Sequence, residues 1–111
     1  MKIAISSQGK EKESLIDLRF GRCTYFQIYD TDTEKLTAIE NSAISSTGGA
    51  GIQAANLLLN ENVDAVVTGI LGPNAVQVLK ASDVKIFTSG IKKISDIISD
   101  YKENKLEVKE Y

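Results

Sequence analysis

The stretch that decides the fold is DAVVTGILGPNAVQVL, residues 64–79. Its first part, Asp64–Thr68, is short, apolar and rich in β-branched residues, and it predicts a buried strand. Pro73 then suits the first turn of a helix, because its missing N–H would have no partner there. The apolar residues that follow recur at helical spacing and are Ala75, Val76, Val78 and Leu79. A strand, a tight turn and a helix in this order form the unit of a parallel α/β sheet.

The rest of the chain extends this unit on both sides. After it, we expect a strand at Val84–Thr88 and an amphipathic helix whose apolar face is formed by Ile94, Ile97, Ile98 and Tyr101. Before it, Asp30–Glu34 is a cluster of turn residues that joins two strands into a hairpin. The elements expected before residue 64 are strands at Lys2–Ser6, Cys23–Asp30 and Lys35–Asn41 and a helix at Ile52–Asn62.

This order predicts a single α/β domain over residues 1–111, with a mixed five-stranded sheet flanked by three helices. Strands that alternate with helices run parallel through right-handed crossovers, whereas the hairpin makes Cys23–Asp30 the one antiparallel strand. The last segment, Leu106–Tyr111, alternates only weakly. It is either a tail or a short added strand, and we favour a tail.

Composition narrows the function. Of the 111 residues, 42% are hydrophobic and 25% are charged, as in an ordinary folded domain. The net charge of −2 lacks the basic excess of a nucleic-acid-binding protein. No apolar run approaches the ~20 residues that span a bilayer, and the apolar stretch Ile3–Ile5 is too short for a signal peptide. We therefore expect a cytoplasmic protein with no nucleic-acid partner and no membrane partner.

The residue types also weigh against an enzyme. There is no histidine, which removes the commonest general base and the commonest metal ligand. Cys23 is the single cysteine, so an intramolecular disulfide and any site that needs several thiolates are excluded. Ile3–Ile5 carries no acidic residue, although a metal-dependent nuclease built on such a sheet would need one there. We expect no catalytic residue.

Unusual residues gather at one rim of the expected sheet, where the first, third and fourth strands end. Ligands of open α/β sheets bind beyond the carboxyl ends of the parallel strands. Both arginines, Arg19 and Arg22, lie on this rim, and Cys23 follows them at once. The rim also holds five of the eight glycines, namely Gly48, Gly49, Gly51, Gly69 and Gly72.

The loop and the arginines each have two readings. The loop Ser46–Gly51 either lets a helix start approach an anion or is a flexible connection with Thr47 as the helix cap. Arg19 and Arg22 either hold an anionic ligand through bidentate contacts or pair with nearby carboxylates such as Asp17.

Cys23 and Asn74 also each have two possible roles. A lone cysteine is usually a buried small hydrophobe, but a thiolate would be favoured if Cys23 were exposed next to Arg22. Asn74 lies in a tight turn between a strand and a helix, where it could also contact a ligand.

Three blocks of the sequence resemble one known family. RFGRCTYF, residues 19–26, resembles the FGR-x-x-Y-F signature of the dinitrogenase iron–molybdenum cofactor biosynthesis family, which includes NifX-type proteins and the C-terminal domain of the NifB type. GGAGIQAA at residues 48–55 resembles the second block of that family. VDAVVTG at residues 63–69, followed by GPNA at residues 72–75, resembles the third. The blocks have the right order and spacing, and the resemblance covers nearly the whole chain.

The resemblance implies a ribonuclease H-like fold and a non-catalytic protein. Such a protein binds or carries an iron–sulfur or molybdenum-containing cluster, or a precursor, and its partners are cluster donor or acceptor proteins. Members often carry His just before the FGR block, where this chain has Arg19, and in the Gly-rich loop, where it has Ser46 and Thr47. Cys23 is then the one soft metal ligand on the rim.

Clusters usually take four protein ligands, so one thiolate would dock a preassembled cluster only with help from the arginines and backbone N–H groups. This predicts a labile carrier with no permanently bound cofactor. The predicted binding residues are Arg19, Arg22, Cys23, Gly48, Gly49, Gly51 and Asn74.

Two other functions stay open. A module that binds or senses a small anionic metabolite, with no metal, would use the same rim with Cys23 merely packed, and the missing histidines favour it. A ribonuclease H-like nuclease is suggested by the implied fold alone, and the missing acidic residues count against it. Exposure of Cys23 separates the first two functions, because a buried thiol favours the metabolite-binding module.

Overall fold

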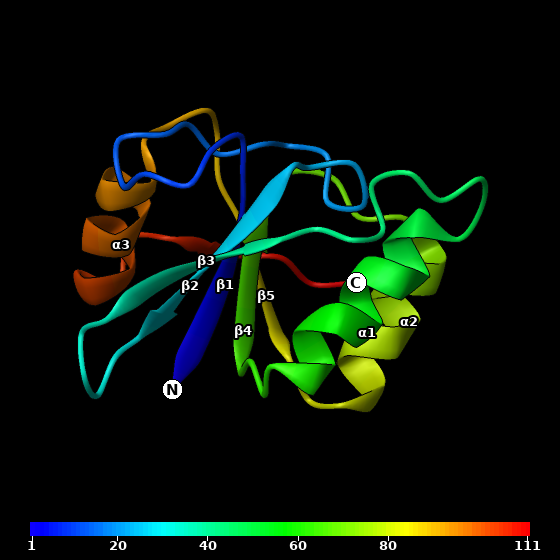
Figure 1. The fold of residues 1–111 in the computed structure, drawn as a ribbon. Coiled ribbons are helices and arrows are strands. Elements are labelled where there is room, and N and C mark those ends of the chain that lie inside the picture. The colour runs from blue at the N-terminus through cyan, green and yellow to red at the C-terminus, as the bar shows by residue number, and fades with distance from the viewer.

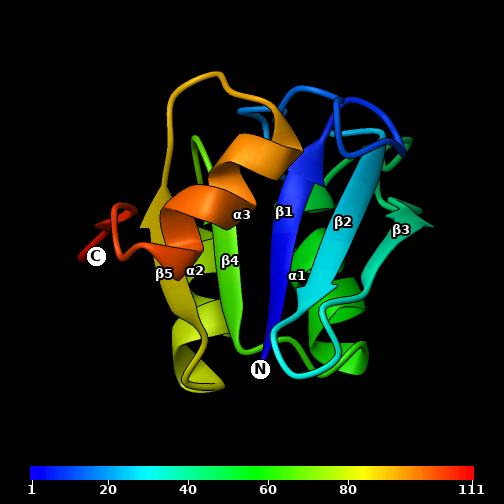
Figure 2. The same cartoon turned by 90° about the vertical axis from the view of Figure 1, so that its left-hand side faces the viewer.

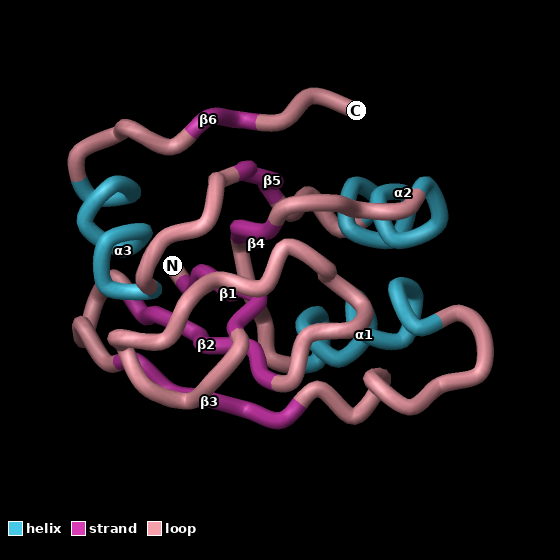
Figure 3. Tube along the Cα trace, turned by 90° about the horizontal axis from the view of Figure 1, so that it is seen from above, coloured by secondary structure: helices cyan, strands magenta, loops and turns pink.

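A six-stranded mixed sheet forms the middle layer of the molecule, and helices cover both of its faces (Figures 1 and 2). The computed structural model describes residues 1–111. The strands follow the order β3-β2-β1-β4-β5-β6 and are β1 (Lys2–Ser7), β2 (Tyr25–Asp30), β3 (Leu36–Glu40), β4 (Ala65–Thr68), β5 (Lys85–Thr88) and β6 (Glu107–Val108). The helices are α1 (Ala50–Asn60), α2 (Pro73–Ala81) and α3 (Ile94–Lys102). Helices α1 and α2 lie side by side on one face, and α3 covers the other (Figure 3).

The strand directions in the centre of the sheet agree with the sequence analysis. β1 pairs in parallel with β4, and β4 with β5, whereas β2 is antiparallel to both β1 and β3. The hairpin turns at Asp30–Glu34, where the Asp30 carboxylate accepts a hydrogen bond of 2.9 Å from the Asp32 amide. Strands β1, β3, β4 and β5 therefore end at the same side of the sheet, which we call the top rim.

The C-terminal segment differs from the expectation. Leu106–Tyr111 was expected to be a tail, but Glu107 and Val108 form β6, which pairs antiparallel with Thr88 and Phe87 of β5. The sheet thus has six strands where we expected five, and β6 is a second strand that runs against its neighbour. Two residue pairs are too few for the alternation of apolar residues to reveal the strand. The ribonuclease H-like assignment stays a prediction.

Helix α1 starts earlier than the sequence analysis predicts. It begins at Ala50, two residues before the expected Ile52, and Gly49 precedes it in the left-handed conformation with φ of 70°. This backbone conformation favours glycine, because a Cβ atom would be strained there. Thr47 does not cap the helix, since no side chain bonds to its first N–H groups.

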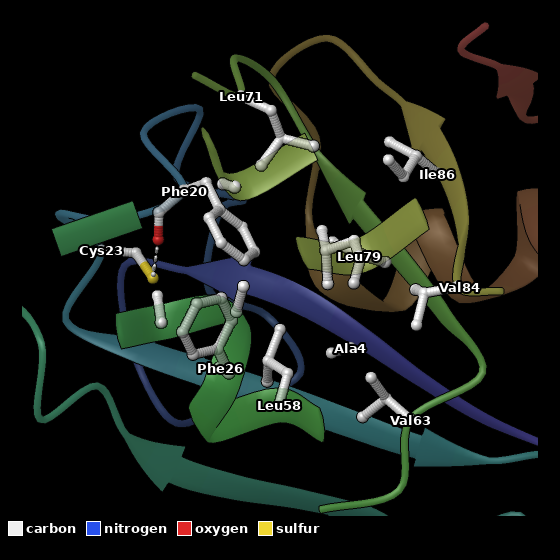
Figure 4. Close-up of a cluster of buried hydrophobic side chains, with 14 of the residues drawn as sticks. Ala4, Phe20, Cys23, Phe26, Leu58, Val63, Leu71, Leu79, Val84 and Ile86 are labelled. Carbon is white, nitrogen blue, oxygen red and sulfur yellow. Dashed lines mark hydrogen bonds between the residues drawn. The ribbon is translucent and has the colours of Figure 1, made fainter. Parts of the chain in front are cut away.

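The hydrophobic core is divided between the two faces of the sheet. Alternate residues of β1 point to opposite faces, so Ala4 packs under α1 and α2 while Ile3 packs under α3. Phe26 and Leu58 are fully buried in the first cluster, as Figure 4 shows. None of the three helices has the length and apolarity that crossing a bilayer demands.

The carboxyl ends of β1 and β4 are covered by the segment that follows β1. Ser6 and Thr68 are buried there, and their hydroxyl oxygens lie 2.7 Å apart. The Ser6 hydroxyl also donates to the Asp17 carbonyl at 2.6 Å, and the Ile70 amide donates to the Leu18 carbonyl at 2.8 Å. A ligand therefore cannot reach these strand ends, and a site on the top rim must lie to one side of them.

Candidate functional site

Three segments meet on the top rim, on the side of α1 and α2. A Cβ atom built on Gly21 would lie 2.9 Å from the Gly51 nitrogen, so the turn Arg19–Arg22 rests directly on the start of α1. A Cβ atom on Gly51 would lie 3.4 Å from the Cβ of Ala75, so the first turns of α1 and α2 are in contact. The structure thus brings together the FGR turn and the N-termini of both helices.

The loop that enters α1 is rich in free hydrogen-bond donors. No backbone N–H from Thr47 through Ile52 donates a hydrogen bond within the chain, and the first one that does is that of Gln53, to the Gly49 carbonyl at 2.9 Å. We call residues 47–52 the donor loop. The first turn of α1 contains no acidic residue and has no side-chain cap. Free N–H groups and a positive helix end together favour an anion.

The start of α2 adds to this arrangement. The N–H groups of Asn74 and Ala75 also donate no hydrogen bond within the chain, and the first bond of the helix runs from Val76 to Gly72 at 3.1 Å. There is again no acidic residue in the first turn and no side-chain cap. Of the predicted residues, Gly48, Gly49, Gly51 and Asn74 thus all lie at two adjoining helix starts.

Arg22 is attached to the same loop. Its Nη1 donates to the carbonyl oxygens of Ile44 and Ser46, both at 2.8 Å. No carboxylate pairs with it, since the ion pairs of the chain involve other residues. The Ser46 hydroxyl in turn donates to Gln53 Oε1 at 2.7 Å, which ties the loop to the first turn of α1. Arg22 therefore holds the chain just before the donor loop.

Arg19 has a different environment. Its guanidinium pairs with the Asp17 carboxylate at 3.0 Å, which is the ion pair that the sequence suggested as one alternative. A contact between Arg19 and a ligand stays a prediction. The hydrogen bonds that the guanidinium donates to the Asp17 carboxylate raise the pKa of Arg19 above its ordinary value. Arg19 lines a separate cleft of about 530 Å³ together with Thr24 and Ile91. The structure thus separates the two arginines, which the sequence analysis treated as a pair.

Cys23 lies in the core and not on the rim. Its side chain is fully buried, and its Sγ–H donates to the Phe20 carbonyl at 3.3 Å (Figure 4). Burial raises the pKa of the Cys23 thiol to about 12, so it is neutral at physiological pH. This corrects the picture of an exposed thiolate supported by Arg22. A ligand role for Cys23 stays a prediction, and it would require the turn around Phe20 to open.

Asn41 belongs to the site, although the sequence analysis missed it. Its side-chain amide donates to the carbonyls of Gly21 (3.1 Å) and Cys23 (2.9 Å), and its oxygen accepts the Ala43 N–H at 3.1 Å. It is 2% exposed, so these bonds are shielded from water. The one sequence signal is its place at a strand end before a loop, where Asn often bonds to the backbone two residues on.

The groups that meet at this site are hydrogen-bond donors, which suit an anion, and not a set of metal-chelating side chains. No three His, Cys, Asp or Glu side chains lie close enough together to hold one. The groups that converge are backbone N–H donors, two helix starts and one arginine.

Comparisons with known proteins identify one family. Residues 1–104 match the sequence model of the family described as dinitrogenase iron-molybdenum cofactor. A curated but uncharacterized protein of Methanocaldococcus jannaschii is 31% identical over 91 residues, which cover 79% of this chain and 77% of that protein.

Two solved structures have the same fold. The apo form of the orange protein from Desulfovibrio gigas superposes with a TM-score of 0.91 at 27% identity, covering 97% of this chain and 92% of that one. A Thermotoga protein provisionally described as a NifB protein superposes with a TM-score of 0.85 at 32% identity, covering 96% of this chain and 91% of that one.

Proposed function

Because this chain belongs to the dinitrogenase iron–molybdenum cofactor family, we propose that it is a non-catalytic carrier of an anionic metal–sulfur cluster. The cargo is an iron–sulfur or molybdenum-containing cluster or a precursor of one. The observation that carries the proposal is the donor loop, in which every backbone N–H from Thr47 through Ile52 is free beside a second helix start.

The donor loop suits the outer atoms of such a cluster. Sulfido and oxo ligands carry the negative charge of the cluster and accept hydrogen bonds. Successive backbone N–H groups form anion-binding concavities in many proteins. Gly48 and Gly49 are exposed and carry no side chain that would keep a bulky anion away. Gly51 and Asn74 extend the contact surface to both helices.

Docking through these outer atoms does not require Cys23. Removing the buried thiol proton would place a charge in the core, and the raised pKa reflects that cost. A cluster held by hydrogen bonds keeps its own metal–sulfur bonds and can leave without breaking any. This is the behaviour a carrier needs, and donor or acceptor proteins would be its partners. Ile44 and Ile70, exposed on loops of the top rim, offer apolar contact for them.

The buried thiol also favours a second candidate function. A module that binds a small anionic metabolite without metal would use the same N–H groups and would leave Cys23 packed, as observed. Phosphate oxygens accept hydrogen bonds from helix starts in the same way.

An anaerobic titration separates the two functions. Tetrathiomolybdate, molybdate and phosphate are added to the protein while amide NMR shifts are recorded, and the tetrathiomolybdate sample is then passed through gel filtration and examined by visible spectroscopy. A carrier retains the coloured anion through the column, with the largest shifts at residues 47–52 and 74–75. Retention of phosphate alone would favour the metabolite module. Shifts that map elsewhere would overturn both.

The Cys23→Ser variant tests the ligand role in the same assay. Docking through the outer atoms predicts equal retention and an unchanged spectrum. Loss of the charge-transfer absorption in the variant would instead assign Cys23 as the soft ligand, because sulfur binds thiophilic metals far better than a hydroxyl oxygen does.

A further inference from the structure

We infer that Arg22 is a positioning residue, which acts on ligand binding by presetting the donor loop and not by contacting the ligand. This inference rests on the proposed function. The charge of an arginine next to a binding loop would ordinarily be assigned to the ligand. The hydrogen bonds that Arg22 donates to two carbonyls, and the geometry of the peptide groups that carry them, indicate instead that it orients the loop.

The guanidinium fixes the orientation of two peptide groups. Its Nη1 donates to the carbonyls of Ile44 and Ser46, both at 2.8 Å, and hydrogen bonds from a charged donor are stronger than neutral ones. Every peptide bond of the chain is trans. In a trans peptide the C=O of one residue and the N–H of the next point in opposite directions. Because the Ser46 carbonyl points to Arg22, the Thr47 N–H points away from it.

The first donor of the loop and the Nη1 of Arg22 therefore lie at opposite edges of the Ser46–Thr47 peptide group. One ligand atom cannot accept from both. The hydrogen bond from Arg22 also fixes the orientation of this peptide, so the partial negative charge of the Ser46 carbonyl faces Arg22 and the Thr47 N–H faces the opposite way. Arg22 thus keeps the Ser46 carbonyl oxygen, which would repel an anion, away from the side on which Thr47 presents its N–H.

Two further contacts make this arrangement rigid. Asn41 holds the turn that carries Arg22, through its bonds to the carbonyls of Gly21 and Cys23. At the other end of the loop, the Ser46 hydroxyl bonds to Gln53 in the first turn of α1. From Thr47 through Ile52 no N–H group bonds within the chain, so the bond from Arg22 to the Ser46 carbonyl is the main constraint on where the donor loop starts.

The test uses the variants Arg22→Gln and Lys12→Gln. Lys12 is exposed in the segment after β1, next to the start of α3, where its carbonyl accepts the Ser95 N–H at 2.9 Å. Its variant removes one positive charge without touching the donor loop. Affinity for tetrathiomolybdate is measured anaerobically at roughly 50 mM and roughly 500 mM salt, because salt screens charge effects at exposed groups but leaves loop geometry in place. Amide hydrogen exchange of Ile44, Ser46 and Gln53, the bonded N–H groups that flank the donor loop, is followed in the ligand-free protein.

A positioning role predicts a loss of affinity on the order of tenfold for Arg22→Gln at both salt concentrations. It also predicts faster exchange of the bonded amides on either side of the donor loop, those of Ile44, Ser46 and Gln53. Lys12→Gln should show a small loss at low salt only. Arg22→Lys keeps the charge but is one bond shorter, so it should recover the low-salt part of the loss and not the part that persists at high salt.

The inference is overturned if the Arg22→Gln loss disappears at high salt, as for Lys12→Gln, and exchange of these flanking amides is unchanged. If the wild-type protein binds no tetrathiomolybdate, the proposed carrier function fails. The exchange measurement then decides separately, because unchanged exchange in Arg22→Gln would show that Arg22 does not hold the loop.

Discussion

The carboxylate of Asp17 accepts three hydrogen bonds from Arg19: from its backbone N–H at 2.9 Å, from Nε at 3.1 Å and from Nη2 at 3.0 Å. The two side chains differ in environment, because that of Arg19 is 70% exposed and that of Asp17 is 6% exposed. The arginine therefore serves mainly to neutralise a buried charge. The same Asp17 residue closes the top of β1 through its carbonyl bond to Ser6.

We expect Arg19→Gln to be more destabilising than its exposure suggests. The substitution leaves the Asp17 carboxylate buried with only one backbone donor, so we expect a clear decrease in the free energy of unfolding, larger than that of a substitution at an unpaired surface arginine. Arg22→Gln is the matched control, because Arg22 pairs with no carboxylate, and it should cost roughly 0.5 kcal/mol. Urea unfolding of both variants checks this. Equal costs would contradict the neutralising role of Arg19.

Gly21→Ala should weaken the contact between the FGR turn and α1. The new Cβ would lie 2.9 Å from the Gly51 nitrogen and 3.0 Å from the Ala50 carbonyl carbon, and both of these are backbone atoms that cannot move alone. Overpacking of this kind costs about 1–3 kcal/mol. Gly48→Ala is the control, because no atom lies within 4 Å of the Cβ that it would add. Chemical denaturation of both variants measures the difference, and equal midpoints would show that the turn shifts freely.

The Cys23 thiol should be unreactive in the folded protein. Its pKa of about 12 leaves almost no thiolate at neutral pH, so alkylation by iodoacetamide should be slow in buffer and fast in denaturant. Mass spectrometry of timed samples follows the reaction. Rapid alkylation of the native protein would mean that the turn around Phe20 opens often.

Stability should also fall at alkaline pH because of the same thiol. Burial raises its pKa from 9.0 to about 12, so above pH 9.0 the unfolded chain loses the proton that the folded chain keeps. Folding stability is then complete below pH 9.0 and decreases by roughly 1.4 kcal/mol per pH unit up to about pH 12. Cys23→Ala should lack this decrease, and the difference between the two unfolding curves isolates it from other groups. Parallel curves would contradict the burial of the thiol.

Asn41→Asp should be strongly destabilising. Asp has no N–H to donate, so its carboxylate would face the Gly21 and Cys23 carbonyls at the positions where Asn41 now bonds to them. We expect a loss of roughly 2–3 kcal/mol at neutral pH, with part of it recovered in acid, where a protonated carboxyl donates one bond. Thermal unfolding at two pH values tests this. A variant as stable as the wild type at neutral pH would show that the Asn41 donors matter little.

Most of the fold could be predicted from the sequence, because its apolar periodicity is clear. The β4–turn–α2 unit and the α3 helix were predicted within a residue or two of their observed bounds. The edge strand β6 was missed, since two paired residues carry no period of their own. The start of α1 was misplaced because helical apolar spacing begins at Ile52, whereas the backbone turns into the helix at Gly49.

Chain direction predicts that Arg22, the glycine-rich loop and Asn74 share the top rim, as they do, whereas the environments of Arg19 and Cys23 could not be decided from the sequence. Arg22 and Cys23 are neighbours in the sequence. Sequence position alone cannot reveal that Arg22 binds the Ile44 and Ser46 carbonyls while Cys23 is buried in the core. The direction of the chain does not decide whether Cys23 faces the solvent. The turn at Phe20–Gly21 orients its sulfur toward the core. The role of Asn41 depends on tertiary contacts with residues about twenty positions away.

A donor loop made of main-chain N–H groups has a consequence for how such proteins diverge. Thr47 and Gly48 are exposed and their side-chain positions contribute no hydrogen bond to it, so these residues can be exchanged while the donors remain. Proline is the residue that deletes a donor, because it has no N–H. A relative can therefore change the exposed side chains of this loop and keep its anion chemistry, while a single proline in it removes part of that chemistry without changing the charge of the protein.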